Sequence, residues 1–148
     1  MKILILYPNL PMMITPATSV AIFTSIIKEM QCDVQMFETT LYTEDENQGM
    51  LYKSKLGGGR SYNVAQLGFL LKPTNLMLPN LVKKVKEYKP DLLLCSTVED
   101  TFEDTNMMLK SVEEYNIPHI VGGVFPINAP EVCLSSTNIN VICRYEGE

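Results

Sequence analysis

Several patterns that known classes of functional site require are missing from this sequence. Histidine occurs once, at His119, and none of the four cysteines forms a Cys-x-x-Cys pair. Structural zinc sites use closely spaced ligand pairs and iron–sulfur clusters use clustered thiolates, so neither is expected within the chain. No apolar run reaches the ~18 residues that a membrane-spanning helix needs, so no membrane association is expected.

Basic residues are also few, and acidic residues outnumber them. The sequence has 12 Lys and Arg residues against 17 Asp and Glu residues, which gives a net charge of −5. Affinity for nucleic acid comes mostly from the neutralisation of phosphates by Lys and Arg. A nucleic-acid partner is therefore not expected.

The start of the chain lacks the features of a secretory signal. The segment MKILILYPNLP has a short apolar stretch, Pro8 and Pro11 interrupt it, and no small-residue cleavage site follows. This pattern predicts a strand. Cys95 and Cys143 lie inside apolar runs, where a cysteine usually behaves as a small buried hydrophobe. We therefore expect reduced thiols and a cytoplasmic location.

What is present is the material for one globular domain over residues 1–148. Hydrophobic residues make up 46% of the 148 residues and charged residues 20%. A chain of this length can bury roughly 68–70% of its unfolded surface, so it needs no disulfide or metal to fold.

Short apolar runs alternate with amphipathic segments along the chain. The runs predict strands at 2–7, 33–37, 91–96, 118–121 and 140–143, and the periodic segments predict helices at 17–30, 75–89, 101–116 and 130–135. This alternation is typical of a doubly wound α/β fold, a Rossmann-like parallel sheet between two layers of helices. For five strands we expect the flavodoxin-like order 2-1-3-4-5.

Ligands of such sheets bind at the carboxyl ends of the strands. The loops that follow those ends are 8–16, 38–74, 97–101 and 122–126. None of them carries a Gly-x-Gly-x-x-Gly or a Gly-x-x-x-x-Gly-Lys-Ser/Thr motif, which excludes the usual dinucleotide and P-loop sites. The first loop is apolar and stiffened by prolines, which suits a large, flat, mainly apolar ligand. The pair Gly122-Gly123 fits either a tight turn or the close approach of a ligand to the backbone.

Five stretches in order along the chain carry a family resemblance. They are KILILYPNLP (2–11), FETTLY (37–42), KPDLLLCSTVEDTF (89–102), IPHIVGGVFPINAPE (117–131) and CRYEGE (143–148). Together they resemble the cobalamin-binding domain that precedes the catalytic domain in cobalamin-dependent radical S-adenosylmethionine enzymes. The resemblance covers nearly the whole chain.

The resemblance implies that cobalamin binds at the carboxyl edge of the sheet. Residues 96–98 would contact its nucleotide tail, Gly122 and Gly123 would let the tail pass over the fourth strand, and residues 9–13 would face the lower side of the corrin ring. The positions that the resemblance assigns to the cofactor are Asn9, Leu10, Pro11, Met12, Ser96, Thr97, Val98, Glu99, Gly122, Gly123, Val124, Tyr145 and Glu146.

Two departures qualify what the resemblance implies. Many cobalamin carriers place an Asp-x-His-x-x-Gly pattern in the first loop, whose histidine ligates cobalt, and this chain has no histidine there. His119, at the start of the fourth strand, lies ~10 Å or more from the ligand edge at ~3.3 Å per residue. We therefore expect cobalamin without a protein histidine on cobalt, an arrangement that favours methyl transfer.

The second departure is the lack of the Cys-x-x-x-Cys-x-x-Cys motif that holds the radical [4Fe–4S] cluster. We therefore expect the cluster and S-adenosylmethionine to belong to a C-terminal radical domain of the same polypeptide. The chain by itself is not expected to be the enzyme. The longer protein would be a methyltransferase.

Alternatives stay open at three places. The long loop 43–74 is either a lid or domain contact, or a solvated or disordered segment. The acidic residues at 99–104 are interpreted as partners of a helix dipole and not as a catalytic group. The alternative function is a flavodoxin-like docking or interaction domain that binds no corrin.

Overall fold

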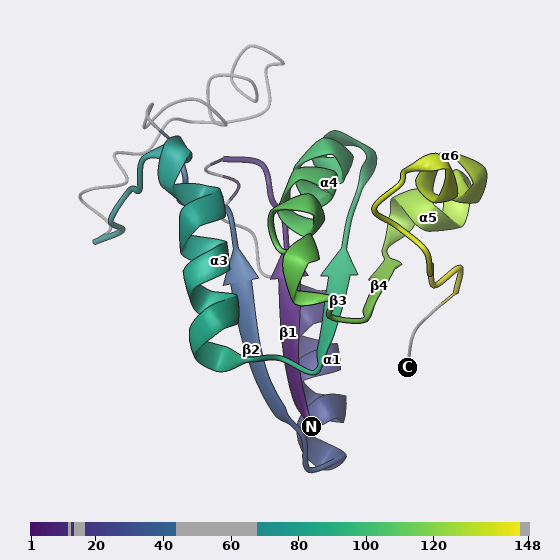
Figure 1. Ribbon diagram of the computed structural model, residues 1–148, viewed down its shortest axis with the longest axis horizontal. Coiled ribbons are helices and arrows are strands. Elements are labelled where there is room, and N and C mark those ends of the chain that lie inside the picture. Colours follow the sequence, from purple (N-terminus) through teal and green to yellow (C-terminus); the bar gives the residue numbers. More distant parts are fainter. Residues whose placement is uncertain (12, 14–16, 44–67, 146–148) are drawn as a thin grey trace.

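Strands and helices alternate along the chain (Figure 1). The computed structural model describes residues 1–11, 13, 17–43 and 68–145. The elements are β1 (Lys2–Tyr7), α1 (Thr18–Glu29), β2 (Asp33–Glu38), the 3-10 turn η2 (Thr74–Leu76), α3 (Met77–Tyr88), β3 (Leu92–Ser96), η3 (Glu99–Thr101), α4 (Phe102–Ser111), η4 (Glu113–Tyr115), β4 (His119–Gly122), α5 (Val124–Asn128) and α6 (Pro130–Ser135).

The described strands form a four-stranded parallel sheet in the order β2-β1-β3-β4. This confirms the α/β class and the relative order of the first four strands. The expected fifth strand at 140–143 meets β4 through one parallel bridge, between Val121 and Ile142. Two backbone hydrogen bonds hold it, from Val121 N to Val141 O at 3.1 Å and from Cys143 N to Val121 O at 2.9 Å. The described residues therefore show four strands, with one short additional pairing beside β4.

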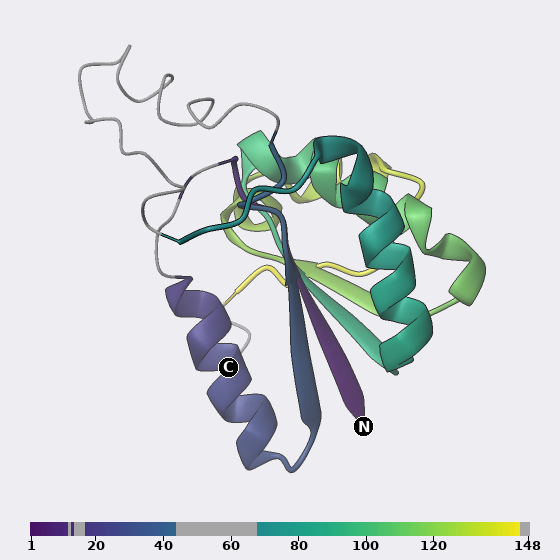
Figure 2. The ribbon, with the colours of Figure 1, turned by 90° about the vertical axis from the view of Figure 1, so that its left-hand side faces the viewer.

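Side chains of β1 alternate between two apolar layers. Leu4 and Leu6 belong to the larger buried cluster, which contains Leu81 and Val85 of α3 and Met108 of α4. Consecutive strand residues point to opposite faces of a sheet, so one apolar run supplies both layers. Figure 2 shows the sheet edge-on, with α1 on one face and α3 and α4 on the other.

The face that α1 covers is less completely buried. Ile3 and Ile5 pack with Val20 and Ile27 of α1 and are buried. The apolar residues of β3 on this face, Leu92 and Leu94, are only partly buried. The residues that bury this face come from α1, whereas the other face is buried by residues of α3 and α4.

Three helical segments differ from the sequence expectations. The segment 75–89 opens with η2 before α3 begins, and 101–116 is divided into the end of η3, α4 and η4. Helix α5 was not expected, because five residues are a little over one turn and carry no readable periodicity. None of the helices that the structure describes has the length and apolarity needed to cross a bilayer.

Candidate functional site

The carboxyl ends of the parallel strands lie along one edge of the sheet, and the loops after them define the candidate site (Figure 1). Strand β1 ends at Tyr7, β2 at Glu38, β3 at Ser96 and β4 at Gly122. Strands β3 and β4 are neighbours with Ser96 paired to Gly122, so their loops start side by side. The sequence predicted this juxtaposition from strand order alone.

Asn9 ties the loop after β1 to the residues after β2. Its backbone N donates to Thr39 Oγ1 at 2.8 Å, and Thr39 Oγ1 donates to Asn9 O at 2.9 Å. Its side-chain Nδ2 donates to Met13 O at 2.8 Å and to Thr40 Oγ1 at 3.1 Å, while Leu10 N donates to its Oδ1 at 3.0 Å. The Asn9 amide is thus engaged inside the protein, and its direct effect is to hold the first loop.

Thr97 is the first residue of the loop after β3 and is almost completely buried. Thr105 Oγ1 has two acceptors within reach of its single hydrogen, Thr97 Oγ1 at 2.9 Å and Thr101 O at 3.0 Å, and the Thr97 and Thr101 hydroxyls lie 3.2 Å apart. Val98 N donates to Thr101 Oγ1 at 3.2 Å. The three hydroxyls, which we call the threonine cluster, satisfy one another and fix the loop to the start of α4.

The Gly122-Gly123 pair was expected to serve either a tight turn or the close approach of a ligand, and in the structure the group that approaches Gly123 is the backbone of Thr97. Gly123 has φ +104°. A Cβ built there would clash with Thr97 O and would lie 2.8 Å from Thr97 N. A Cβ on Gly122 would make ordinary contacts, at 3.6 Å from Cys143 Cβ and 4.0 Å from Cys95 O. Glycine at 123 is therefore explained by the packing of the two loops.

Apolar side chains are exposed where β3 and β4 end. Val98 is 45% exposed and Val124 is 61% exposed. Each lies two residues after a paired strand end, and the loops are joined by Thr97 N donating to Gly122 O at 2.9 Å. Beside them the rings of Phe102 and Phe125 pack with centroids 4.8 Å apart. Together they form an apolar rim at the carboxyl edge.

The remaining predicted site residues are placed as follows. Leu10, Pro11 and Ser96 are partly buried, and Glu99 and Tyr145 are exposed. Met12 and Glu146 lie outside the described residues, as do residues 44–67 of the long loop. Tyr145 O accepts a hydrogen bond from Cys143 Sγ at 3.2 Å.

The acidic residues after β3 lie at helix starts, as the sequence predicted. Glu99 is in the first turn of η3, and Glu103 and Asp104 are in the first turn of α4. Partial burial raises the pKa of the Asp104 carboxyl, and the neighbouring charge of Glu103 raises it further. Carboxylates near a helix N-terminus interact favourably with the helix dipole.

Metal-binding clusters were not expected, and the described residues contain no group of three or more His, Cys, Asp and Glu side chains that could hold a metal ion. His119 begins β4, at the end of the strand opposite the candidate site. Its Nε2 is buried and has no hydrogen-bond partner within the described structure.

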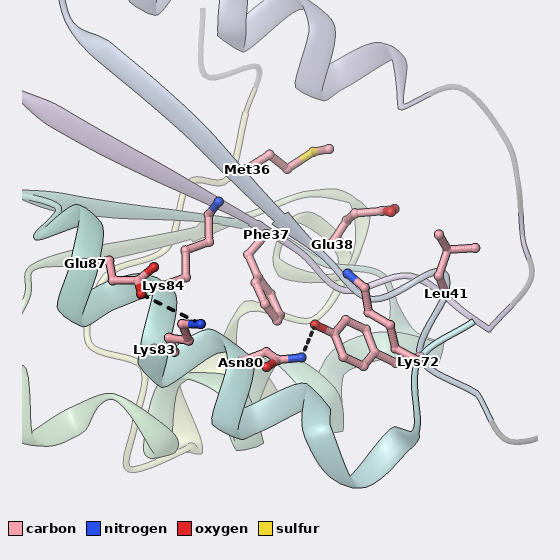
Figure 3. Close-up of a pocket in the computed structure, with 10 residues that line it drawn as sticks. Met36, Phe37, Glu38, Leu41, Lys72, Asn80, Lys83, Lys84 and Glu87 are labelled. Atoms are coloured by element: carbon pink, nitrogen blue, oxygen red, sulfur yellow. Dashed lines mark hydrogen bonds and ion pairs between the residues drawn. The ribbon is translucent and has the colours of Figure 1, made fainter. Parts of the chain in front are cut away.

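One feature was not identified from the sequence, a hollow of about 350 Å³ beside β2 and α3 (Figure 3). It is lined by Met36, Phe37, Glu38, Leu41, Tyr42, Lys72, Asn80, Lys83, Lys84 and Glu87. The only sequence signal for it was the position of Lys83 and Lys84 off the apolar face of their helix. The other residues come from parts of the chain that only the fold brings together.

Comparisons with known proteins give no assignment. A scan against protein-family models found no match, and a search of curated proteins found no significant match. The function has to be inferred from the residues and their geometry.

Proposed function

We propose that this chain binds cobalamin at the carboxyl edge of its sheet, as the cobalamin-binding module of a radical S-adenosylmethionine methyltransferase. The observation that carries the proposal is the apolar rim, in which Val98 and Val124 stay exposed at the ends of two paired strands. Ligands of such sheets ordinarily bind at this edge. Apolar side chains exposed there are suited to contact with a broad, mainly apolar ligand face.

The loops that would receive the cofactor are held in place before it binds. The threonine cluster fixes the loop after β3, and Asn9 fixes the loop after β1. A surface that is already ordered pays less conformational entropy on binding. The Ser96 hydroxyl, which has no hydrogen-bond partner within the described structure, is available to a polar group of the nucleotide tail.

The proposal includes the complete flavodoxin-like sheet with five strands in the order 2-1-3-4-5. Its support is the parallel bridge between Val121 and Ile142, which lies on the side of β4 away from β3. In this arrangement the fifth segment would extend the edge at which the cofactor binds.

Bound cobalamin would supply the methyl-transfer chemistry of its cobalt. The chain would bind it without a protein histidine on the metal, because His119 begins β4 and the proposed surface follows the end of that strand. The contribution of the described residues is to bind and orient the corrin. The [4Fe–4S] cluster and S-adenosylmethionine would belong to a C-terminal radical domain.

Titration of the purified protein with hydroxocobalamin, followed by desalting and visible absorbance, tests the proposal. We expect a retained corrin spectrum shifted toward a form without a nitrogen base on cobalt. Val124→Glu should reduce retention, because it places a charge on the apolar rim. Val132→Glu on α6 is the matched control, since Val132 is 51% exposed but lies outside the rim. Absence of retained corrin in the unmodified protein would contradict the proposal.

A second candidate is a flavodoxin-like docking domain that binds no corrin. Its support is the exposure of three apolar side chains on the short helices α5 and α6, Ile127, Val132 and Leu134. This candidate predicts no retained corrin in the same titration.

A further inference from the structure

The hollow beside β2 and α3 gathers positive charge in a protein that is acidic overall. Three lysines and two glutamates line it, so its lining carries a net charge of +1, whereas the whole chain carries −5. Figure 3 shows Lys72, Lys83 and Lys84 around the same hollow. Lys83 and Lys84 come from α3, and Lys72 comes from the segment before η2.

The lysines differ in how their charge is compensated. Lys83 Nζ lies 3.9 Å from Glu87 Oε1, and both side chains are largely exposed, so this pair is weak. Lys84 is partly buried and has no carboxylate within ion-pair distance among the described residues. A partly desolvated ammonium without a counter-charge is stabilised by an incoming anion. Lys84 is therefore the centre of the site.

Lys72 is held above the ring of Tyr42, which we call the floor of the hollow. Its Nζ lies 5.1 Å from the centroid of the Tyr42 ring. Backbone pairing fixes the two residues opposite each other, because Lys72 N donates to Leu41 O at 2.8 Å and Thr43 N donates to Lys72 O at 3.0 Å. The Lys72 ammonium is thereby kept at the rim of the hollow.

The floor also offers neutral hydrogen-bonding groups. Asn80 Nδ2 donates to Tyr42 Oη at 3.1 Å, a hydrogen bond that is dashed in Figure 3. The Tyr42 side chain is buried. Because the Tyr42 hydroxyl accepts from Asn80, its own hydrogen remains to be donated to a ligand oxygen. Lysine ammonium groups act as strong point charges toward phosphate.

One of the two glutamates that line the hollow, Glu38, is engaged by another side chain. Glu38 Oε2 accepts a hydrogen bond from Thr40 Oγ1 at 2.6 Å. The apolar side chains of Met36, Phe37 and Leu41 also line the hollow, and we call them its apolar wall. A ligand with a phosphate group toward the lysines and an apolar part toward this wall matches both halves.

From these contacts we infer that the hollow between β2 and α3 binds the phosphate group of a small molecule, with Lys84 and Lys72 as its principal charged contacts. This site goes beyond the proposed cobalamin function. The cobalamin surface follows β1, β3 and β4, whereas the hollow lies beside β2 at the outer edge of the four-stranded sheet and shares no residue with the positions assigned to cobalamin. One site can therefore fail its test without affecting the other.

The probe is inorganic phosphate, added to isotope-labelled full-length protein and followed by ¹H–¹⁵N correlation spectra. We expect saturable shifts of the Asn80 side-chain amide and of the backbone amides of Tyr42 and Lys84. Sodium chloride at matched ionic strength should not reproduce them. Phenyl phosphate distinguishes an organic phosphate from free phosphate. If phenyl phosphate binds more tightly than inorganic phosphate, the apolar wall takes part and the ligand is an organic phosphate. If the two bind equally, the ligand is free phosphate.

Lys84→Gln should raise the Kd for phosphate about tenfold, the effect of losing one charged hydrogen bond. Lys86→Gln is the matched control, because Lys86 is exposed on the same helix and does not line the hollow. If K84Q lost the folded spectrum, Lys72→Gln would replace it with the same expectation. Shifts that do not saturate, shifts that chloride reproduces, or equal weakening by K86Q would each overturn the site.

Discussion

Replacing Gly123 by alanine tests how the two loops at the candidate site are joined. In the folded protein Gly123 has φ +104° and ψ −176°, a backbone conformation that is essentially restricted to glycine. A Cβ at this position would also overlap the Thr97 backbone, with Thr97 N only 2.8 Å away. Two penalties therefore act together, one from backbone strain and one from overpacking.

The size of the effect follows from these penalties. A non-glycine residue in this region costs ~1–3 kcal/mol, and an overpacked contact costs a further ~1–3 kcal/mol. The expected loss is ~2–6 kcal/mol, a large part of the ~5–15 kcal/mol by which domains are stable. At ~2–4 °C per kcal/mol for a protein of this size, the Tm should fall by roughly 4–24 °C.

Gly122→Ala is the matched control. The neighbouring glycine has no positive φ, and its added Cβ would make only ordinary contacts with Cys143 and Cys95. G122A should therefore lose less than ~1 kcal/mol. Urea unfolding of both variants, followed by far-ultraviolet circular dichroism, gives the comparison. Failure of G123A to fold while G122A folds agrees with the expectation, and equal urea midpoints would refute the reasoning.

Three further predictions concern other contacts around the site. Burial raises the pKa of Cys95 to about 12, so iodoacetamide should modify the partly exposed Cys143 well before Cys95 in the native protein, and equal rates in peptide mass mapping would contradict this. Thr105→Val removes the hydroxyl that donates to Thr97 and should cost about 1–3 kcal/mol in urea unfolding, whereas Thr105→Ser should cost clearly less. Asn9→Ala should cost a similar ~1–3 kcal/mol and should increase amide hydrogen exchange at Leu10, and unchanged exchange there would show that Asn9 does not hold the loop.

Much of the architecture was predictable, because short apolar runs and periodic segments are local signals. Strand β1 was expected at 2–7 and is observed at Lys2–Tyr7, and helix α6 was expected at 130–135 and is observed at Pro130–Ser135. The expected order 2-1-3-4-5 placed β2 at the edge of the sheet, and β2 lies at an edge of the observed sheet. Strand–helix alternation then limits the strand order to few possibilities.

The fifth strand illustrates a limit of such local signals. The run at 140–143 has the composition of a strand, yet only Ile142 pairs with β4, and Val141 is 51% exposed. A run at the edge of a sheet has one neighbour, so its own sequence does not determine how many residues pair. Helix α5 was missed for a related reason, since it is shorter than two helical repeats.

The site shows the same division between local and long-range information. The sequence marked the loops at the carboxyl edge correctly, because strand ends are local features. It could not show that the group requiring glycine at 123 is the Thr97 backbone, since this contact joins two different loops. The hollow was missed because Tyr42 and Lys72 meet Asn80 only in three dimensions.

The backbone pairing between Tyr42 and Lys72 has a consequence for how the protein can be altered. These two residues are bridged to each other although 29 residues separate them in the sequence. Because Tyr42 and Lys72 are fixed side by side, a flexible insertion between them would add a closure cost of only ~0.6 kcal/mol for each doubling of loop length. This junction is therefore a suitable insertion point for a fluorescent or affinity module, and a site at which homologous chains can differ widely in length without a change in the sheet.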